Sequence, residues 1–366
     1  MVRRVPVRLG GIAAATAALL AATACGAGSA PSDGRLRIVA AFYPLEYVAE
    51  RVGGDRVTVE GLAPAGGHAH DRELTVRQAA LISDADLVIH LSGVQPSVDA
   101  AVRAYAPEAL DVATVVPLRT TAHDRPEPRP AGAGAEPTGR GDTGAGRHPG
   151  PGPDEAGTGR DPETGHGDAG TGHDPDTGRH GDPGTGHDAG TGHGGVDPHV
   201  WLDPHRLAAV ASEVADALAR LDPAHAAGYA ARAGALRTDL AELDAAYADG
   251  LARCERREIV VAHAAFGYLA DRYGLQQIAV AGLEPDGEPT PGRVIEVVEL
   301  ARSHGATTVF AEAGTSPDVA RVIAGELGAR TATLDPIEAR APGSDADYLS
   351  LMRANLAALT EGLGCA

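Results

Sequence analysis

The chain has 366 residues and a formal net charge of −19 at pH 7. Nucleic acid and anionic membrane surfaces would repel such an acidic chain, whereas a surplus of carboxylates is compatible with collecting cations. About 260 residues remain once an N-terminal segment and a low-complexity tract are set aside, and this is enough for two lobes of ordinary domain size.

The N-terminal segment has the pattern of an export signal followed by a tether. Arginines precede an apolar run at residues 9–24 that is too short for a comfortable membrane span. Small residues lead into Cys25, and residues 25–34 are rich in Gly, Ser and Pro. This resembles a bacterial lipoprotein signal, so we expect a signal peptide at 1–24, a lipid on Cys25 and anchoring to the outer face of the cell membrane. The alternative is a simple signal peptide that is cleaved and lost.

Residues 35–119 alternate between short runs of β-branched residues and amphipathic helical patterns. This alternation predicts a parallel sheet with crossover helices, which is an N-terminal α/β lobe. The expected strands are 36–41, 57–62, 87–91 and 112–116, and the expected helices are 45–52, 76–83 and 96–105.

A His-rich acidic tract occupies residues 120–195, in which Thr-Gly-His recurs and aliphatic residues are almost absent. Such a segment buries too little apolar surface to offset the entropy of ordering, so we expect a disordered loop. Concentrated imidazole favours zinc, copper or nickel over magnesium or calcium, bound weakly in many arrangements. The alternative is a linker that is rich in His only by composition.

Helical spacing without any strand signal follows the tract. Residues 196–222 are expected to return the chain to the N-terminal lobe and to end in a helix. Asp222 as N-cap and Pro223 at the first helical position predict a linking helix over 223–254. At 1.5 Å per residue it would be roughly 45 Å long and would span both lobes.

Residues 255–366 repeat the strand and helix alternation and predict a C-terminal α/β lobe. With Cys25 assigned to lipid, Cys254 and Cys365 remain in an oxidising compartment. They form either a disulfide or two unrelated thiols. The expected strands are 259–261, 277–280, 308–311 and 331–334, and the expected helices are 266–273, 291–303, 317–327 and 347–363.

Potential metal ligands recur where segments begin or strands end. His70 follows the expected strand at 57–62, His263 and Asp335 end strands of the C-terminal lobe, and His199 begins the segment after the tract. Any one of them alone reads as a structural histidine or an N-capping aspartate. Together they suit one metal site in the cleft between the lobes, because ligands bind at the carboxyl ends of parallel strands.

Several long motifs stand out in chain order: VAAFYPLEYVAERVGG at 39–54, the Gly-rich turn before Asp71, DPHVWLDP at 197–204, HAAFGYLADRYGL at 263–275 and YLSLMRANL at 348–356. Together they resemble the metal-binding solute-binding lipoproteins of zinc and manganese ABC transporters. The resemblance implies two α/β lobes around a metal, with His70, His199, His263 and Asp335 as ligands.

Details of the resemblance bear on the metal. Ala69 replaces the proline common before the first ligand, so His68 is an alternative to His70. Manganese members tend to carry Glu where this chain has His263, and three imidazoles with one carboxylate prefer zinc to manganese. Glu312 at a strand end is a candidate to accept a hydrogen bond from a ligand imidazole, with an ion pair or a solvated face as the alternatives.

The resemblance implies an extracytoplasmic receptor, a monomer, that captures Zn2+ and delivers it to an ABC permease. A manganese receptor or an adhesin on the same scaffold is the alternative. A zinc hydrolase is a weaker one, because the sequence has no His-Glu-x-x-His helix. We therefore expect no enzymatic activity.

Overall fold

The computed structural model describes residues 34–63, 73–120, 195–283, 289–341 and 343–366. The expected signal peptide, Cys25, His68, His70 and nearly all of the His-rich tract lie outside these residues. Within them, no helix combines the length and the apolar character that crossing a membrane requires.

The N-terminal lobe is built on a four-stranded parallel sheet with the strand order β2-β1-β3-β4. Helices pack on both faces, because alternate residues of the central strand β1 enter two apolar clusters, one with α1 and one with α2 and α3. The elements are β1 (Leu36–Ala40), α1 (Tyr43–Gly53), β2 (Val57–Gly61), α2 (Val76–Asp84), β3 (Leu87–His90), α3 (Pro96–Tyr105) and β4 (Leu110–Asp111).

The strand expected at 112–116 is wrong. The fourth strand ends at Asp111, and Val112–Thr114 forms a 3-10 turn. The Asp111 carboxylate accepts hydrogen bonds from the backbone N–H groups of Ala113 and Ser92, both at 3.0 Å. This cap ends the strand early, although Val112 is still fully buried.

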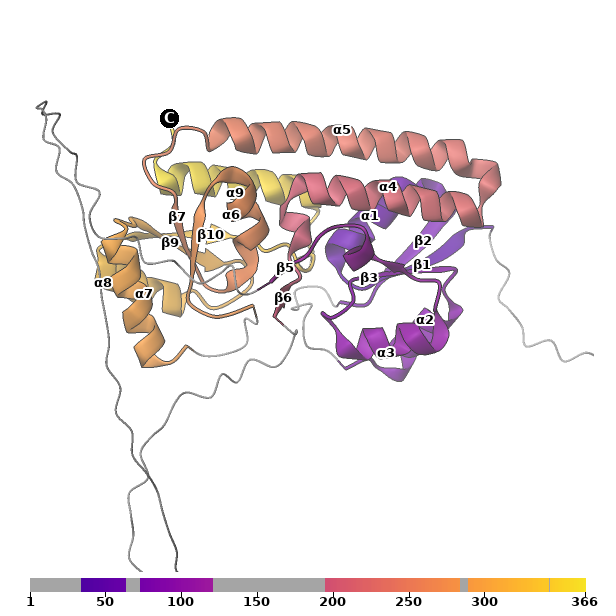
Figure 1. Cartoon of the computed structure of the whole chain (residues 1–366), viewed down its shortest axis with the longest axis horizontal. Helices are drawn as coiled ribbons and strands as arrows, with labels where there is room; N and C mark the ends of the chain where they lie inside the picture. The colour runs from indigo at the N-terminus through magenta and orange to yellow at the C-terminus, as the bar shows by residue number, and fades with distance from the viewer. Residues whose placement is uncertain (1–33, 64–72, 121–194, 284–288, 342) are drawn as a thin grey trace, which may run out of the picture.

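The C-terminal lobe repeats this architecture with the parallel strand order β10-β9-β7-β8. The prediction of two α/β lobes is confirmed (Figure 1). The elements are β7 (Glu258–Val261), α6 (Gly267–Tyr273), β8 (Gln276–Ala279), α7 (Pro291–Ser303), β9 (Thr308–Glu312), α8 (Asp318–Leu327), β10 (Arg330–Leu334) and α9 (Tyr348–Leu363).

Two long helices follow, α4 (Pro204–Leu221), which packs on α1 of the N-terminal lobe, and α5 (Ala226–Gly250), which packs on α4. The 25 residues of α5 run along both lobes (Figure 1). The first turn differs from expectation, because Pro223–His225 is a 3-10 turn and Asp222 does not cap it. Its carboxylate accepts instead from the His225 ring and the Tyr229 hydroxyl, both at 2.7 Å.

Two further links join distant parts of the chain. Cys254, beyond the end of α5, forms a disulfide with Cys365 at the C-terminus. Strand β5 (Arg119–Thr120) pairs antiparallel with β6 (Val196–Asp197), on either side of residues 121–194. We call the pair β5 and β6 the stem; it lies between the two lobes (Figure 1).

Candidate metal centre

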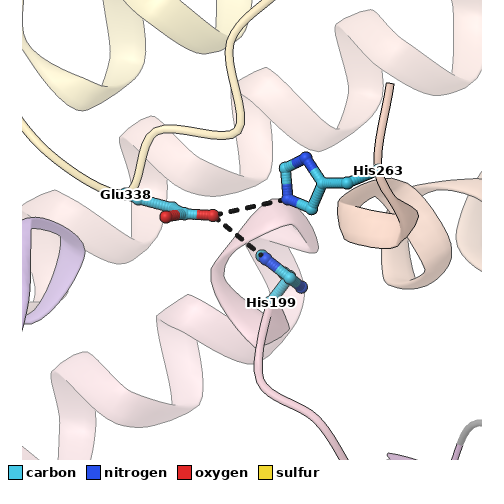
Figure 2. A group of neighbouring side chains, drawn as sticks. All are labelled: His199, His263 and Glu338. Atoms are coloured by element: carbon cyan, nitrogen blue, oxygen red, sulfur yellow. Dashed lines mark hydrogen bonds and ion pairs between the residues drawn. The ribbon is translucent and has the colours of Figure 1, made fainter. Parts of the chain in front are cut away.

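Three buried side chains from distant parts of the sequence meet between the lobes. His199, His263 and Glu338 each offer a ligand atom within 4.8 Å of the others. Figure 2 shows the Glu338 carboxylate facing both rings, with Oε1 3.3 Å from Nε2 of His199 and 3.5 Å from Nε2 of His263. None of the three residues is more than 3 % exposed, so any ion held here would be shielded from bulk water.

His199 is held by the residues around it. It follows β6 and begins the 3-10 turn Val200–Leu202, where Trp201 contacts its ring edge-on at 5.2 Å between centroids. Oδ1 of Asp197 lies 2.9 Å from its Nδ1 and also accepts from its backbone N–H at 3.0 Å. A proton held on Nδ1 leaves the Nε2 lone pair for a metal.

His263 has a matching partner. It comes two residues after β7, and its Nδ1 lies 2.6 Å from Oε2 of Glu312, the last residue of β9. Because β7 and β9 are neighbouring parallel strands, their carboxyl ends bring these side chains together. Each imidazole of the centre therefore has a carboxylate on Nδ1 and presents Nε2 to Glu338.

Glu338 was not named from the sequence. It lies in the loop after β10, where Trp201 donates from Nε1 to the Pro336 carbonyl at 2.7 Å and Asn355 bonds both backbone polar groups of Asp335. The backbone of Ile337 is left-handed, with a φ of 58°. This turn carries the chain from the strand end to the carboxylate that faces the two rings.

Asp335 is not part of this group of three. Its Oδ1 accepts from the Ile337 backbone N–H at 2.7 Å, so the carboxylate shapes the turn that presents Glu338. Burial raises its pKa, and the nearby charges of Glu312 and Glu338 raise it further. The structure thus brings His199 and His263 together and adds Glu338, while His70 and His68 lie outside the described residues.

The carboxylates determine the protonation of the two rings. Burial alone would lower the pKa of His263, but hydrogen bonds to Glu312 and Glu338 outweigh it and raise the pKa to about 9. Burial opposes protonation of His199 as well, and Asp197 and Glu338 raise its pKa in the same way. In the absence of metal at neutral pH, a proton therefore occupies the Nε2 position of His263 that a cation would take.

The fold and the centre define a two-lobed α/β protein with a buried group of side chains that could hold a divalent cation. A family model described as "Zinc-uptake complex component A periplasmic" (ZnuA) matches residues 38–362. The chain belongs to this family.

Similar proteins carry zinc in their names. Zinc-binding lipoprotein AdcA of Streptococcus pneumoniae (strain ATCC BAA-255 / R6) is 29% identical over 337 residues, which is 90% of this chain and 56% of that protein. High-affinity zinc uptake system protein ZnuA of Bacillus subtilis (strain 168) is 32% identical over 171 residues, 46% of this chain and 54% of that protein. The chain thus spans about half the length of the AdcA sequence.

Solved structures agree in fold. The Zn(II)-bound ZnuA-like domain of Streptococcus pneumoniae AdcA has a TM-score of 0.63 at 25% identity, covering 90% of this chain and 99% of that one. Laminin binding protein (Lmb) of Streptococcus agalactiae, described as a bifunctional protein with adhesin and metal transporting activity, has a TM-score of 0.64 at 25% identity, covering 90% and 99%.

Proposed function

We propose that the protein is an extracytoplasmic receptor that captures Zn2+ and delivers it to an ABC permease for uptake. The observation that carries the proposal is the buried group of His199, His263 and Glu338 between the lobes. Family membership and relatives named for zinc binding or zinc uptake support it.

The donor set favours zinc over harder cations. Two imidazoles and one carboxylate match the nitrogen and oxygen ligands of tetrahedral zinc sites, which take a fourth ligand. We propose His70 for that position, with His68 as the alternative, because β2 leads into the segment that contains both. Glu338 takes the place in the shell that the sequence suggested for Asp335.

The chemistry is coordination without turnover. Asp197 and Glu312 hold a proton on Nδ1 of each imidazole and keep both rings in place. The zinc ion displaces the proton that His263 holds in the metal-free centre, and Glu338 supplies negative charge in a site shielded from water. We therefore expect no enzymatic activity, and we place the protein at the outer face of the cell membrane, anchored through Cys25.

A second function has one specific observation in its favour. The Lmb structure, similar over nearly its whole length, is described as having adhesin activity besides metal transport. An adhesive role would use the outer surface of the scaffold and would leave the buried centre unchanged. Growth of a deletion strain in zinc-poor medium tests uptake, and binding of the purified protein to laminin tests adhesion.

Titration with metal followed by native mass spectrometry tests the receptor proposal. Protein purified without added metal should bind one zinc ion tightly and bind manganese more weakly. His199→Ala, His263→Ala and Glu338→Gln should each lose the tight ion. His205→Ala is the matched control, because it removes an exposed imidazole on α4, and it should keep the ion. Tight binding in the three site variants would overturn the assignment.

A further inference from the structure

The stem contains a buried ion pair, and the carboxylate of this pair also hydrogen-bonds the proposed zinc ligand His199. Arg119 of β5 lies opposite Asp197 of β6 in the antiparallel register, and Nη1 of the arginine is 3.8 Å from Oδ2 of the aspartate. The other oxygen of the same carboxylate, Oδ1, lies 2.9 Å from Nδ1 of His199. Asp197 is therefore shared between the stem and the metal centre.

Side chains of helix α6, in the C-terminal lobe, contact both Arg119 and Asp197. Nε of Arg119 lies 3.0 Å from Oδ2 of Asp271, and its guanidinium carbon lies 5.6 Å from the centre of the Tyr268 ring. The Tyr268 hydroxyl accepts from the Arg119 backbone N–H at 2.8 Å and donates to the Asp197 carbonyl at 2.9 Å. One tyrosine thus bridges both strands of the stem.

The packing leaves little room for either charged group to move. Arg119 is 9 % exposed and Asp197 is fully buried. A Cβ at Gly267, in the first turn of α6, would lie 1.8 Å from Nη1 of Arg119 and 2.8 Å from Oδ2 of Asp197. Glycine is needed at this position because the helix backbone packs directly against the ion pair.

Stability alone is a poor explanation for a buried ion pair. Removing two charges from water is expensive, and well-packed apolar residues of similar volume often stabilise a protein as well or better. The geometry offers another reason. If Oδ2 is engaged by Arg119, Oδ1 is left for Nδ1 of His199, and the ring is fixed with Nε2 toward Glu338.

We propose that Arg119 is a positioning residue for zinc binding, which acts through Asp197 to orient the imidazole of His199. The proposal rests on the proposed function, because it takes His199 as a zinc ligand. It assigns the stem a role in setting zinc affinity, in addition to joining the ends of residues 121–194. We call the series Arg119, Asp197 and His199 the relay. His263, whose Nδ1 partner is Glu312, is not part of the relay.

Nuclear magnetic resonance of the metal-free protein tests the relay without depending on zinc. In full-length protein labelled with 15N-histidine, Arg119→Met should shift the Nδ1 and Nε2 resonances of His199 and leave those of His263 in place. Glu312→Gln is the matched control and should do the reverse. Equal shifts at both rings, or none at His199, would overturn the proposal. Asp271→Asn removes an exposed partner of Arg119 and should cause a smaller shift at His199, even if Arg119→Met folds poorly.

Chelator competition then measures the effect on zinc. Loss of groups that orient a metal ligand typically lowers affinity 10- to 100-fold, so Arg119→Met should weaken zinc binding by about 10-fold and Arg119→Lys by less. In an Asp197→Asn background, Arg119→Met should add almost nothing, because its route to His199 is already broken. Fully additive losses, or unchanged affinity in Arg119→Met, would contradict the relay. Failure of the unmodified protein to bind zinc would instead overturn the proposed function.

Discussion

Each imidazole of the centre lies between two carboxylates, and this decides how the metal-free protein responds to pH. A neutral imidazole titrates near pH 6.5, so an isolated three-histidine site would lose zinc below about pH 6. Glu312 and Glu338 raise the pKa of His263 to about 9 despite its burial. Competition between protons and zinc therefore extends well above the range expected from free imidazole.

We predict that zinc affinity rises with pH between about pH 7 and pH 9, as His263 loses its proton. The stability of the metal-free protein should change in the opposite sense. A pKa raised in the folded state contributes stability that is complete below the unfolded value of 6.5 and is lost as pH rises through about 9.

Chelator competition and thermal unfolding across this range measure the two effects. Glu312→Gln is the control, because losing one carboxylate should lower the pKa of His263 and move both transitions to lower pH. Affinity that does not change between pH 7 and pH 9 would contradict the raised pKa.

Ile337 adopts a backbone conformation that β-branched residues rarely take, with a φ of 58° and a fully buried side chain. Such strain costs on the order of 1–3 kcal/mol. Glycine is normally about 0.5–1 kcal/mol worse than alanine inside a regular element. At Ile337 we expect the reverse, with Ile337→Gly more stable than Ile337→Ala by about 1 kcal/mol.

Urea unfolding of the metal-free variants provides the measurement. Ile89 of β3 is the matched control, since it is equally buried and lies in ordinary strand backbone. There, alanine should be the better replacement. The same order of stability at both positions would show that the turn at Ile337 carries no strain.

At the scale of elements, sequence periodicity located the parallel strands because their apolar runs are short and bounded by helical patterns. It failed at 112–116, where the Asp111 carboxylate ends the strand before Val112, Val115 and Val116. Sequence periodicity also does not show how a loop bends after a strand, and this matters for Glu338, the carboxylate of the centre. A rule based on strand ends selected Asp335, whereas a left-handed turn at Ile337 brings Glu338 to the histidines.

That turn left no signal in the sequence, because left-handed positions are normally occupied by Gly, Asn or Asp. His199 and His263 were within reach of sequence reasoning, since His263 follows a strand end and His199 begins the segment after the His-rich tract. Arg119 was not, because its role depends on pairing across residues 121–194, and only the antiparallel register places it beside Asp197.

The pairing of β5 with β6 in the stem allows most of the segment between these strands to be deleted. Thr120 and Val196 are directly paired, so the ends of the intervening segment are already adjacent. We predict that replacing residues 121–192 by a short Gly/Ser linker leaves the tight zinc ion in place and lowers the number of weakly bound ions, because the removed residues carry many of the histidines.

Native mass spectrometry with increasing zinc counts both classes of ion. The same deletion combined with His263→Ala is the control and should lose the tight ion as well. If the deletion alone removed the tight ion or prevented folding, residues 121–192 would be part of the centre or of the fold.

At the scale of the whole molecule, the two lobes share one apolar core. Tyr229 and Leu236 of α5 belong to the same cluster as the buried residues of α1 and α4 in the N-terminal lobe. Toward the other end of this helix, Tyr247 donates from its hydroxyl to the Met352 carbonyl in α9 at 2.7 Å. Wide hinge motion would have to break this core, so we infer that the lobes move little when the centre fills.

The shared core has a calorimetric consequence. Lobe closure that buried about 1,000 Å² of apolar surface would contribute roughly −0.45 kcal/mol/K to the heat capacity of binding, at about 0.45 cal/K/mol per Å². A receptor whose lobes are already packed together should show less than about half of this. Titration calorimetry with zinc at several temperatures, corrected for buffer protonation, gives the value. A heat capacity change near the larger figure would mean that the lobes close around the ion; a small one would mean that zinc enters a centre whose walls are already in place.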